Sequence, residues 1–249
     1  ILPGYLEDKP EVRAEMAYFY GEVSQMDAAA GQVLDALWEC GFNENTLVVF
    51  ASDCGIGLPL ARGTLHDPGI KISLIVCWYK RIQGEQRCAA LTSNTDLLPT
   101  LLEAIGERER VPQSLDGHSL WPFVERGENV AHEYIFAELQ DSCGAMWAIR
   151  NTRYKLIRNF EPDTGLHNDA NVLQTPAGDE MQQTLRNWPR SEIELYDLAQ
   201  DPWERDNLAG NPDIREIESV LTRELDSGFS RIGCHGQKPS TVGKTHSRG

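Results

Sequence analysis

Residues 46–55 read TLVVFASDCG, and this stretch decides how the first half of the chain folds. Its first seven residues form a continuous apolar, β-branched run of strand length, which is typical of a strand covered on both faces. Residues 72–78 (ISLIVCW) form a second run of the same kind. A loop that contains Gly and Pro joins them, from Asp53 to Gly69. The two runs predict the central strands of an α/β sheet.

Helical patterns flank these two strands. Apolar residues at alternating steps of four and three predict one long helix over residues 11–40, ended by Gly41. Its expected core stripe comprises Val12, Met16, Phe19, Val23, Met26, Ala30, Val33 and Leu37. A further helix is expected from Thr95 to Ile105. Long helix, strand, loop, strand and helix predict a mostly parallel α/β sheet domain over residues 1–130.

The pattern changes after about residue 130. Expected elements are short strands at 134–139, 145–151, 153–160 and 194–198, and an amphipathic helix at 212–228. We interpret residues 131–230 as a small antiparallel α+β subdomain with one helix across the sheet. Within it, residues 161–191 are polar and poorly periodic, which predicts a long surface excursion. Residues 231–249 carry no apolar pattern and are expected to be disordered.

Composition excludes several function classes. The 249 residues carry a formal net charge of -15, which disfavours a nucleic-acid binder because such proteins need a basic face. Apolar stretches such as 47–51 are too short to cross a bilayer, so no membrane partner is expected. The six cysteines show no zinc-type spacing, and we expect most to be plain thiols.

The chain opens with Ile1-Leu2-Pro3-Gly4 and shows no secretory signal. We interpret it as a piece of a longer protein, so the residues leave its compartment undecided. We also expect apolar surface on the long helix and the strands to stay exposed when these 249 residues are alone.

A carboxylate and an arginine lie close together in the loop that follows the first strand. In open α/β sheets, ligands bind outside the carboxyl ends of the strands, which places Asp53 at the rim of a crevice. Arg62 follows nine residues later. A carboxylate for a hard cation and an arginine for an oxyanion would suit a sulfate or phosphate ester. Spacing alone favours the alternative, in which Asp53 forms an Asx turn and Arg62 is a solvated loop charge.

Six segments in a fixed order favour the ligand-site interpretation of Asp53 and Arg62 instead. They are TLVVFASDCG at 46–55, RGTLHDPGI at 62–70, SNTDLLPTLL at 93–102, LDGHSL at 115–120, ELYDL at 194–198 and DPWERDNLA at 201–209. In this order they resemble the C-terminal half of the sulfatase family, within the alkaline-phosphatase-like superfamily. The resemblance implies hydrolysis of a sulfate ester or N-sulfate on a sulfated small molecule or glycan. It also implies a periplasmic or extracellular location, and the Arg62 loop is faintly similar to heparan N-sulfatases.

The resemblance also assigns roles by position. Asp53 takes the place of a calcium ligand, and Cys54 the place of an Asn or His that serves the same metal. Arg62 takes the place of the basic residue that contacts sulfate. His66 stands where the family has tyrosine, so it is a candidate for substrate contact, with ordinary packing as the alternative.

The family nucleophile has no counterpart in these residues. Sulfatases use a formylglycine made from the Cys or Ser of a (C/S)-x-(P/A)-x-R motif, and no Cys or Ser here fits it. Cys77 comes nearest, but Tyr79 occupies the Pro/Ala place before Arg81. We therefore expect the formylglycine in the N-terminal half of the same protein, and these residues alone to be inactive. The rival interpretations are a phosphodiesterase or phosphonate hydrolase of the same superfamily, and a non-catalytic remnant, which Cys54 favours.

Four basic residues lie in two adjacent predicted strands: Arg150, Arg153, Lys155 and Arg158. They are expected either to contact a polysulfated sugar or to be solvated strand charges.

Overall fold

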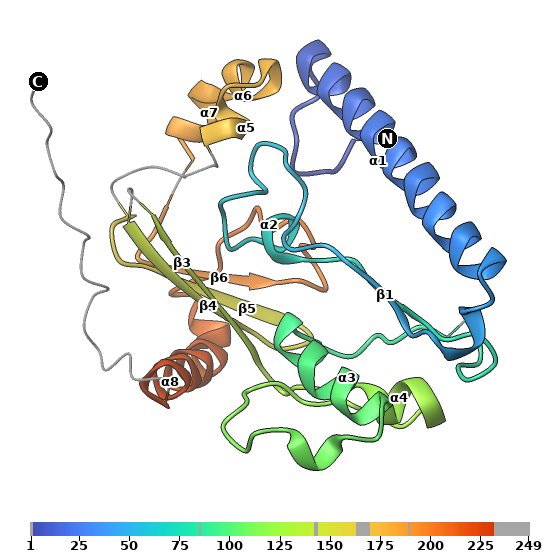
Figure 1. Cartoon of the computed structure of the whole chain (residues 1–249). Helices are drawn as coiled ribbons and strands as arrows, with labels where there is room; N and C mark the ends of the chain where they lie inside the picture. Colours follow the sequence, from blue (N-terminus) through green and yellow to red (C-terminus); the bar gives the residue numbers. More distant parts are fainter. Residues whose placement is uncertain (1, 85, 142–143, 163–169, 189, 232–249) are drawn as a thin grey trace, which may run out of the picture. The chain divides into compact units, whose positions relative to one another are not determined.

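A computed structural model describes residues 2–84, 86–141, 144–162, 170–188 and 190–231 (Figure 1). It divides the chain into two compact units. Unit 1 comprises the described residues of Ile1–Tyr18, Asp53–Ile72 and Phe136–Gly249, and unit 2 comprises those of Phe19–Ser52 and Ser73–Ile135. No helix among the described residues is long and apolar enough to cross a membrane.

Unit 2 holds most of the long first helix and a short sheet. Its elements are α1 (Pro10–Glu39, which begins in unit 1), β1 (Val48–Ala51), β2 (Leu74–Cys77), α3 (Leu97–Ala104), α4 (Trp121–Arg126) and 3-10 turns at Asn43–Asn45, Asn94–Asp96 and Arg108–Arg110. The expected end of α1 is confirmed, since Gly41 has a φ of 72°. That left-handed conformation suits glycine at a helix C-terminus.

The mostly parallel sheet predicted over residues 1–130 is not found between the two strands of this unit. β1 and β2 pair antiparallel, with Val48 opposite Cys77 and Ala51 opposite Leu74. The backbone N–H of Ser52 donates to the carbonyl of Ser73 at 3.0 Å, so the chain returns at the edge where it left the sheet. A parallel partner would have required the chain to cross first to the opposite end of the sheet.

The predicted core stripe of α1 is buried only near its beginning. Val12 and Met16 are buried, whereas Val23, Met26 and Val33 are 37%, 45% and 70% exposed. Helical periodicity shows which side chains share a face, but it does not show whether another layer covers that face. Within the described residues, the later turns of α1 have no such cover.

Unit 1 is built on an antiparallel sheet, as expected. Its elements are α2 (Asp67–Ile70), β3 (Ile135–Asp141), β4 (Gly144–Arg150), β5 (Tyr154–Asn159), α5 (Ala170–Leu173), α6 (Pro176–Glu180), α7 (Gln182–Arg186), β6 (Ile193–Asp197), a 3-10 turn at Pro212–Ile214 and α8 (Arg215–Arg231). The strand order is β3-β4-β5-β6, and the pairs β4·β5 and β5·β6 are antiparallel.

Both faces of this sheet are covered, and side chains that alternate along each strand pack against both covers. α8 crosses one face, where Phe229 stacks on Trp147 with ring centroids 4.1 Å apart (Figure 1). Residues 53–70, here called the site loop, cover the other face. There Leu65 packs with Ile157 and Tyr196 in one apolar cluster. The sheet therefore serves as a platform for the site loop.

The predicted surface excursion at 161–191 is wrong for part of its length. Its short helices α5, α6 and α7 bury Val172, Met181 and Leu185. These apolar residues are too few and too widely spaced to give a periodic signal, although they still pack. Residues 163–169 and 189 lie outside the described residues, as does the predicted disordered tail beyond Arg231.

Candidate functional site

Two glycines close the site loop at its base. The N–H of Gly55 donates to the carbonyl of Gly69 at 2.8 Å, and the N–H of Ile56 donates to Pro68 at 3.1 Å. A Cβ on Gly55 would lie 2.0 Å from the Pro68 carbonyl oxygen, and one on Gly69 would lie 2.3 Å from that of Ala61. The two ends of the loop can meet this closely only because both residues lack a side chain.

The turn that carries Arg62 is fixed by its own backbone. The N–H of Arg62 donates to the carbonyl of Ile56 at 3.1 Å, and the Thr64 hydroxyl donates to that of Ala61 at 2.8 Å. Gly63 has a φ of 85°, and the buried Leu60 has the left-handed φ of 62°. Such a conformation is costly for a leucine and persists only where the surrounding structure enforces it.

Asp53, Cys54 and Arg62 interact within this loop. The pKa of the exposed Asp53 carboxyl lies below its usual value. The main cause is a hydrogen bond from the Cys54 side chain, followed by backbone N–H groups, with a smaller contribution from the Arg62 charge. The carboxylate is therefore ionised at neutral pH. The structure thus brings the predicted metal residue and the predicted oxyanion residue within electrostatic range of each other.

Of the two predicted metal residues in this loop, Asp53 suits calcium and Cys54 does not. Calcium takes six to eight oxygen ligands, and Asp53 supplies a carboxylate. The Cys54 thiol is a soft group that calcium does not prefer, and it is engaged with Asp53. Among the described residues, no three His, Cys, Asp or Glu side chains gather as a metal site.

His66 lies inside the packed face of the site loop. Its side chain is 8% exposed, and its Nε2 lies 3.4 Å from Glu194 Oε2, an ion-pair distance without hydrogen-bond geometry. The ring also meets Tyr196 edge-on at 5.8 Å. Burial alone would raise the pKa of Glu194, but His66, Tyr196 and Asn159 outweigh it and lower the pKa. The structure gives His66 packing partners, and substrate contact by His66 stays a prediction.

Sequence reasoning named Arg150 and Lys155 but missed their carboxylate partners Asp67 and Glu204. These four residues, which join the loop to the sheet, are here called the charged cluster. Lys155 is fully buried, and its Nζ lies 2.5 Å from Asp67 Oδ1 and 2.8 Å from Glu204 Oε1. It also donates to the Leu65 carbonyl at 3.2 Å. Arg150 Nη1 donates to both Asp67 oxygens, at 2.8 and 2.6 Å. Glu204 Oε2 accepts the backbone N–H of Asp67.

The remaining two basic residues of the predicted group also meet carboxylates. Arg153 pairs with Asp197 and Arg158 with Asp226. The four cations therefore do not form one basic surface. The sequence alone could have shown part of this separation. Side chains alternate along a strand, which places Lys155 and Arg158 on opposite faces of β5.

The charges of the cluster determine the ionisation of Asp67. Burial by itself would raise the pKa of Asp67, but Lys155 and Arg150 outweigh it, so the pKa lies below its usual value. A carboxyl with a lowered folded-state pKa stabilises the fold fully above its unfolded pKa. That contribution is lost as the pH falls through the lower folded value. Asp67 is therefore ionised at neutral pH.

Two family models match this chain. The sulfatase model matches residues 4–107, and the model for the C-terminal region of N-sulphoglucosamine sulphohydrolase matches residues 61–186, just over half of the chain. The chain belongs to the sulfatase family. The resemblance drawn from six sequence segments is thereby confirmed. The whole site loop falls within the first match, and its residues from 61 onward also fall within the second.

Individual relatives support this assignment. An ulvan-active sulfatase of Formosa agariphila is 28% identical over 96% of this chain and 42% of its own length. Human N-sulphoglucosamine sulphohydrolase is 27% identical over 90% of this chain and 49% of its own length. The structure of a phosphonate monoester hydrolase of Agrobacterium radiobacter aligns with a TM-score of 0.63 at 25% identity. The alignment covers 85% of this chain and 40% of that enzyme's chain. The sulfatase chain described here thus spans less than half of the length of these relatives.

We expect Gly55→Ala to destabilise unit 1 by about 2 kcal/mol or more, because its new Cβ would collide with backbone that cannot move independently. The matched control is Gly57→Ala, in the same loop, where a Cβ meets nothing within 4 Å. The control should change stability by no more than about 0.5 kcal/mol. Urea unfolding of the three chains measures both effects. Equal stability of the two variants would contradict the closed geometry of the loop.

Proposed function

We propose that the chain supplies the oxyanion-binding arginine and one calcium carboxylate of a sulfuric ester or N-sulfate hydrolase. The observation that carries this proposal is that Asp53 and Arg62 both lie, exposed, on one closed loop. Membership of the sulfatase family supports the reaction class. The similarity to N-sulphoglucosamine sulphohydrolase supports a sulfated sugar as the substrate.

Arg62 would bind the transferring sulfate group. A guanidinium is planar and always charged, and it can donate two parallel hydrogen bonds to two sulfate oxygens. Negative charge that develops on those oxygens in the transition state is stabilised by such a fixed donor. The backbone bonds around Arg62 hold its Cα in place, which lowers the cost of ordering the side chain.

Asp53 would hold the metal. Its ionised carboxylate supplies an oxygen ligand, and bound calcium in turn polarises the oxygens of a bound ester. We propose that the remaining ligands and the formylglycine come from the N-terminal half of the same protein. The absence of a (C/S)-x-(P/A)-x-R motif from the 249 residues supports this division.

A phosphonate monoester hydrolase is the second candidate function, favoured by the structural likeness to the Agrobacterium radiobacter enzyme. The same arginine and carboxylate would suit a phosphonate group, because sulfate and phosphonate are both tetrahedral oxyanions. A third candidate is a remnant that binds sulfated glycans without hydrolysing them. It is favoured by the thiol of Cys54 in a position where calcium needs oxygen.

The first test is catalytic. These 249 residues alone should release no sulfate from an aryl sulfate or from N-sulfated glucosamine at any calcium concentration. In a longer chain rejoined to its N-terminal half, Arg62→Met should lower kcat/KM about 10²-fold or more, as loss of an oxyanion donor does elsewhere. Arg110→Met, which removes an exposed arginine of unit 2, is the control and should leave kcat/KM unchanged.

Assays with an aryl sulfate and a phosphonate monoester in parallel separate the first two candidates. Preference for the phosphonate would favour the second candidate. Turnover by the 249 residues alone would show that their nucleophile has been misassigned.

The second test concerns Cys54. In the rejoined protein, Cys54→Asn should tighten calcium binding and raise sulfate release together, because the asparagine carbonyl adds an oxygen beside Asp53. Calcium titration by calorimetry and a sulfate-release assay measure the two effects. Cys88→Asn, at an exposed cysteine of unit 2, is the matched control and should change neither. If Cys54→Asn leaves both quantities unchanged or lowers them, Cys54 is adapted to a working site.

A further inference from the structure

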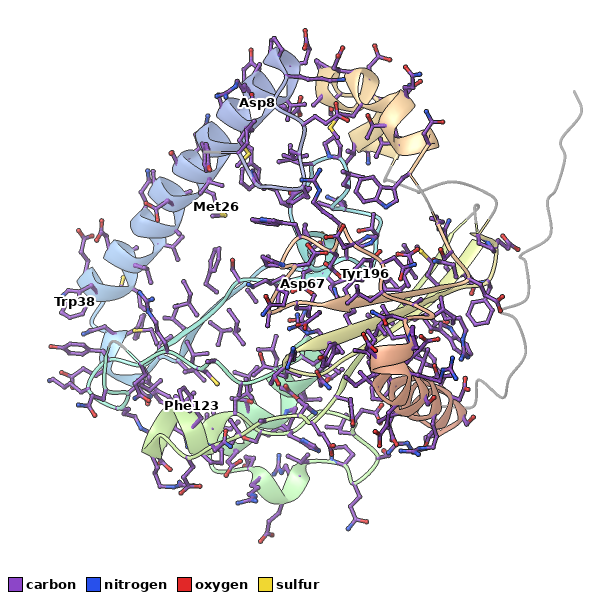
Figure 2. The ribbon with its side chains drawn as sticks, turned by 180° about the vertical axis from the view of Figure 1, so that it is seen from behind. Asp8, Met26, Trp38, Asp67, Phe123 and Tyr196 are labelled. Carbon is purple, nitrogen blue, oxygen red and sulfur yellow. The ribbon has the colours of Figure 1, made fainter. Side chains whose placement is uncertain are left out.

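The charged cluster connects the C-terminal sheet to the turn that carries Arg62. We propose that Lys155 is a positioning residue for the oxyanion site, acting from β5 through the site loop on Arg62. This inference rests on the proposed role of Arg62, and it adds the residue that holds the Arg62 turn in position. Figure 2 shows Asp67 and Tyr196 on the same side of the sheet, where the loop meets it.

The contacts of Lys155 lie on both sides of one loop segment. Its ammonium donates to the carbonyl of Leu65 and pairs with the carboxylate of Asp67, two residues further along. Glu204 completes the arrangement, since it pairs with Lys155 and accepts the backbone N–H of Asp67. A single buried ammonium therefore fixes the backbone and a side chain of the segment that begins three residues after Arg62.

The loop transmits this restraint over a short distance. Thr64 joins the two parts, because its N–H and hydroxyl both bond to the carbonyl of Ala61 while its hydroxyl accepts the N–H of His66. The Arg62 backbone lies inside this turn and bonds back to Ile56. A shift of Leu65 and Asp67 away from the sheet would therefore change the turn that presents Arg62.

Stability alone gives a poor reason for these buried charges. Replacing a buried ion pair by apolar residues of similar size is often neutral or stabilising, because the charges lose their hydration. Lys155 and Glu204 are both completely buried, so their desolvation is at its greatest. What they provide that apolar side chains would not is a directional link to one carbonyl, one carboxylate and one N–H of the site loop.

The test is hydrogen–deuterium exchange of the 249-residue chain without substrate or metal. Lys155→Met should speed exchange in peptides covering residues 62–70 about tenfold or more, with little change in β6 and α8. Arg153→Met is the matched control, because it removes a cation two residues before Lys155 that pairs with Asp197. The control should leave loop exchange unchanged.

A second variant covers the case in which Lys155→Met fails to fold. Lys155→Met/Glu204→Gln removes both fully buried charges and leaves Asp67 paired with Arg150, yet it still breaks the link to Leu65. Faster exchange confined to the loop supports the proposal. Unchanged loop exchange, or equal acceleration throughout β5, β6 and α8, would overturn it.

The rejoined protein provides the functional readout. The double variant should lower kcat/KM for an aryl sulfate about tenfold or more, while Arg153→Met should not. A loosened loop with unchanged kcat/KM would overturn the positioning role. If the wild-type protein hydrolyses no sulfate ester, the proposed function fails, while loop exchange still decides whether Lys155 holds the loop.

Discussion

The ammonium of Lys155, enclosed between two carboxylates and a backbone carbonyl, is the interaction on which the candidate site depends. A buried lysine tolerates its lost hydration only where opposite charges surround it, so Asp67 and Glu204 must be present and correctly placed. Asp67 belongs to the site loop and Glu204 to the turn after β6. The site loop, β5 and the turn after β6 are distant in sequence, and they meet at this one charge. The position of the loop is therefore set by the sheet.

The site loop carries the candidate functional residues and the sheet supports the loop, which explains why the two regions occur together in one unit. The loop carries Asp53 and Arg62, which are both exposed. Its opposite side carries Leu65, His66 and Asp67, which are packed on the sheet. A loop built in this way presents polar groups to the outside while its own position is set from below. Functional side chains on loops commonly depend on such a rigid support.

Much of this arrangement could be predicted from the sequence, and the failures have physical causes. Six ordered segments identified the family, and periodicity found the main helices and strands. Periodicity could not give the direction of β2, which depends on where the chain re-enters the sheet, nor the exposure of α1 beyond Met16. The charged cluster was missed because its members are far apart in sequence, and a lysine within a strand is normally expected to be solvated.

The central claim is that Lys155 and Glu204 act as one buried unit beneath the site loop, and a double-mutant cycle on stability tests it most directly. Urea unfolding of the chain with Lys155→Met, Glu204→Gln and both changes gives the coupling energy between the two side chains. Lys155→Met leaves the buried Glu204 carboxylate without its cation, and Glu204→Gln leaves the buried Lys155 with Asp67 as its remaining carboxylate partner. We therefore predict that the double variant is more stable than the sum of the two losses implies. The expected coupling is about 1 to 3 kcal/mol. Losses that simply add would show that the two charges do not depend on each other, and would contradict the account.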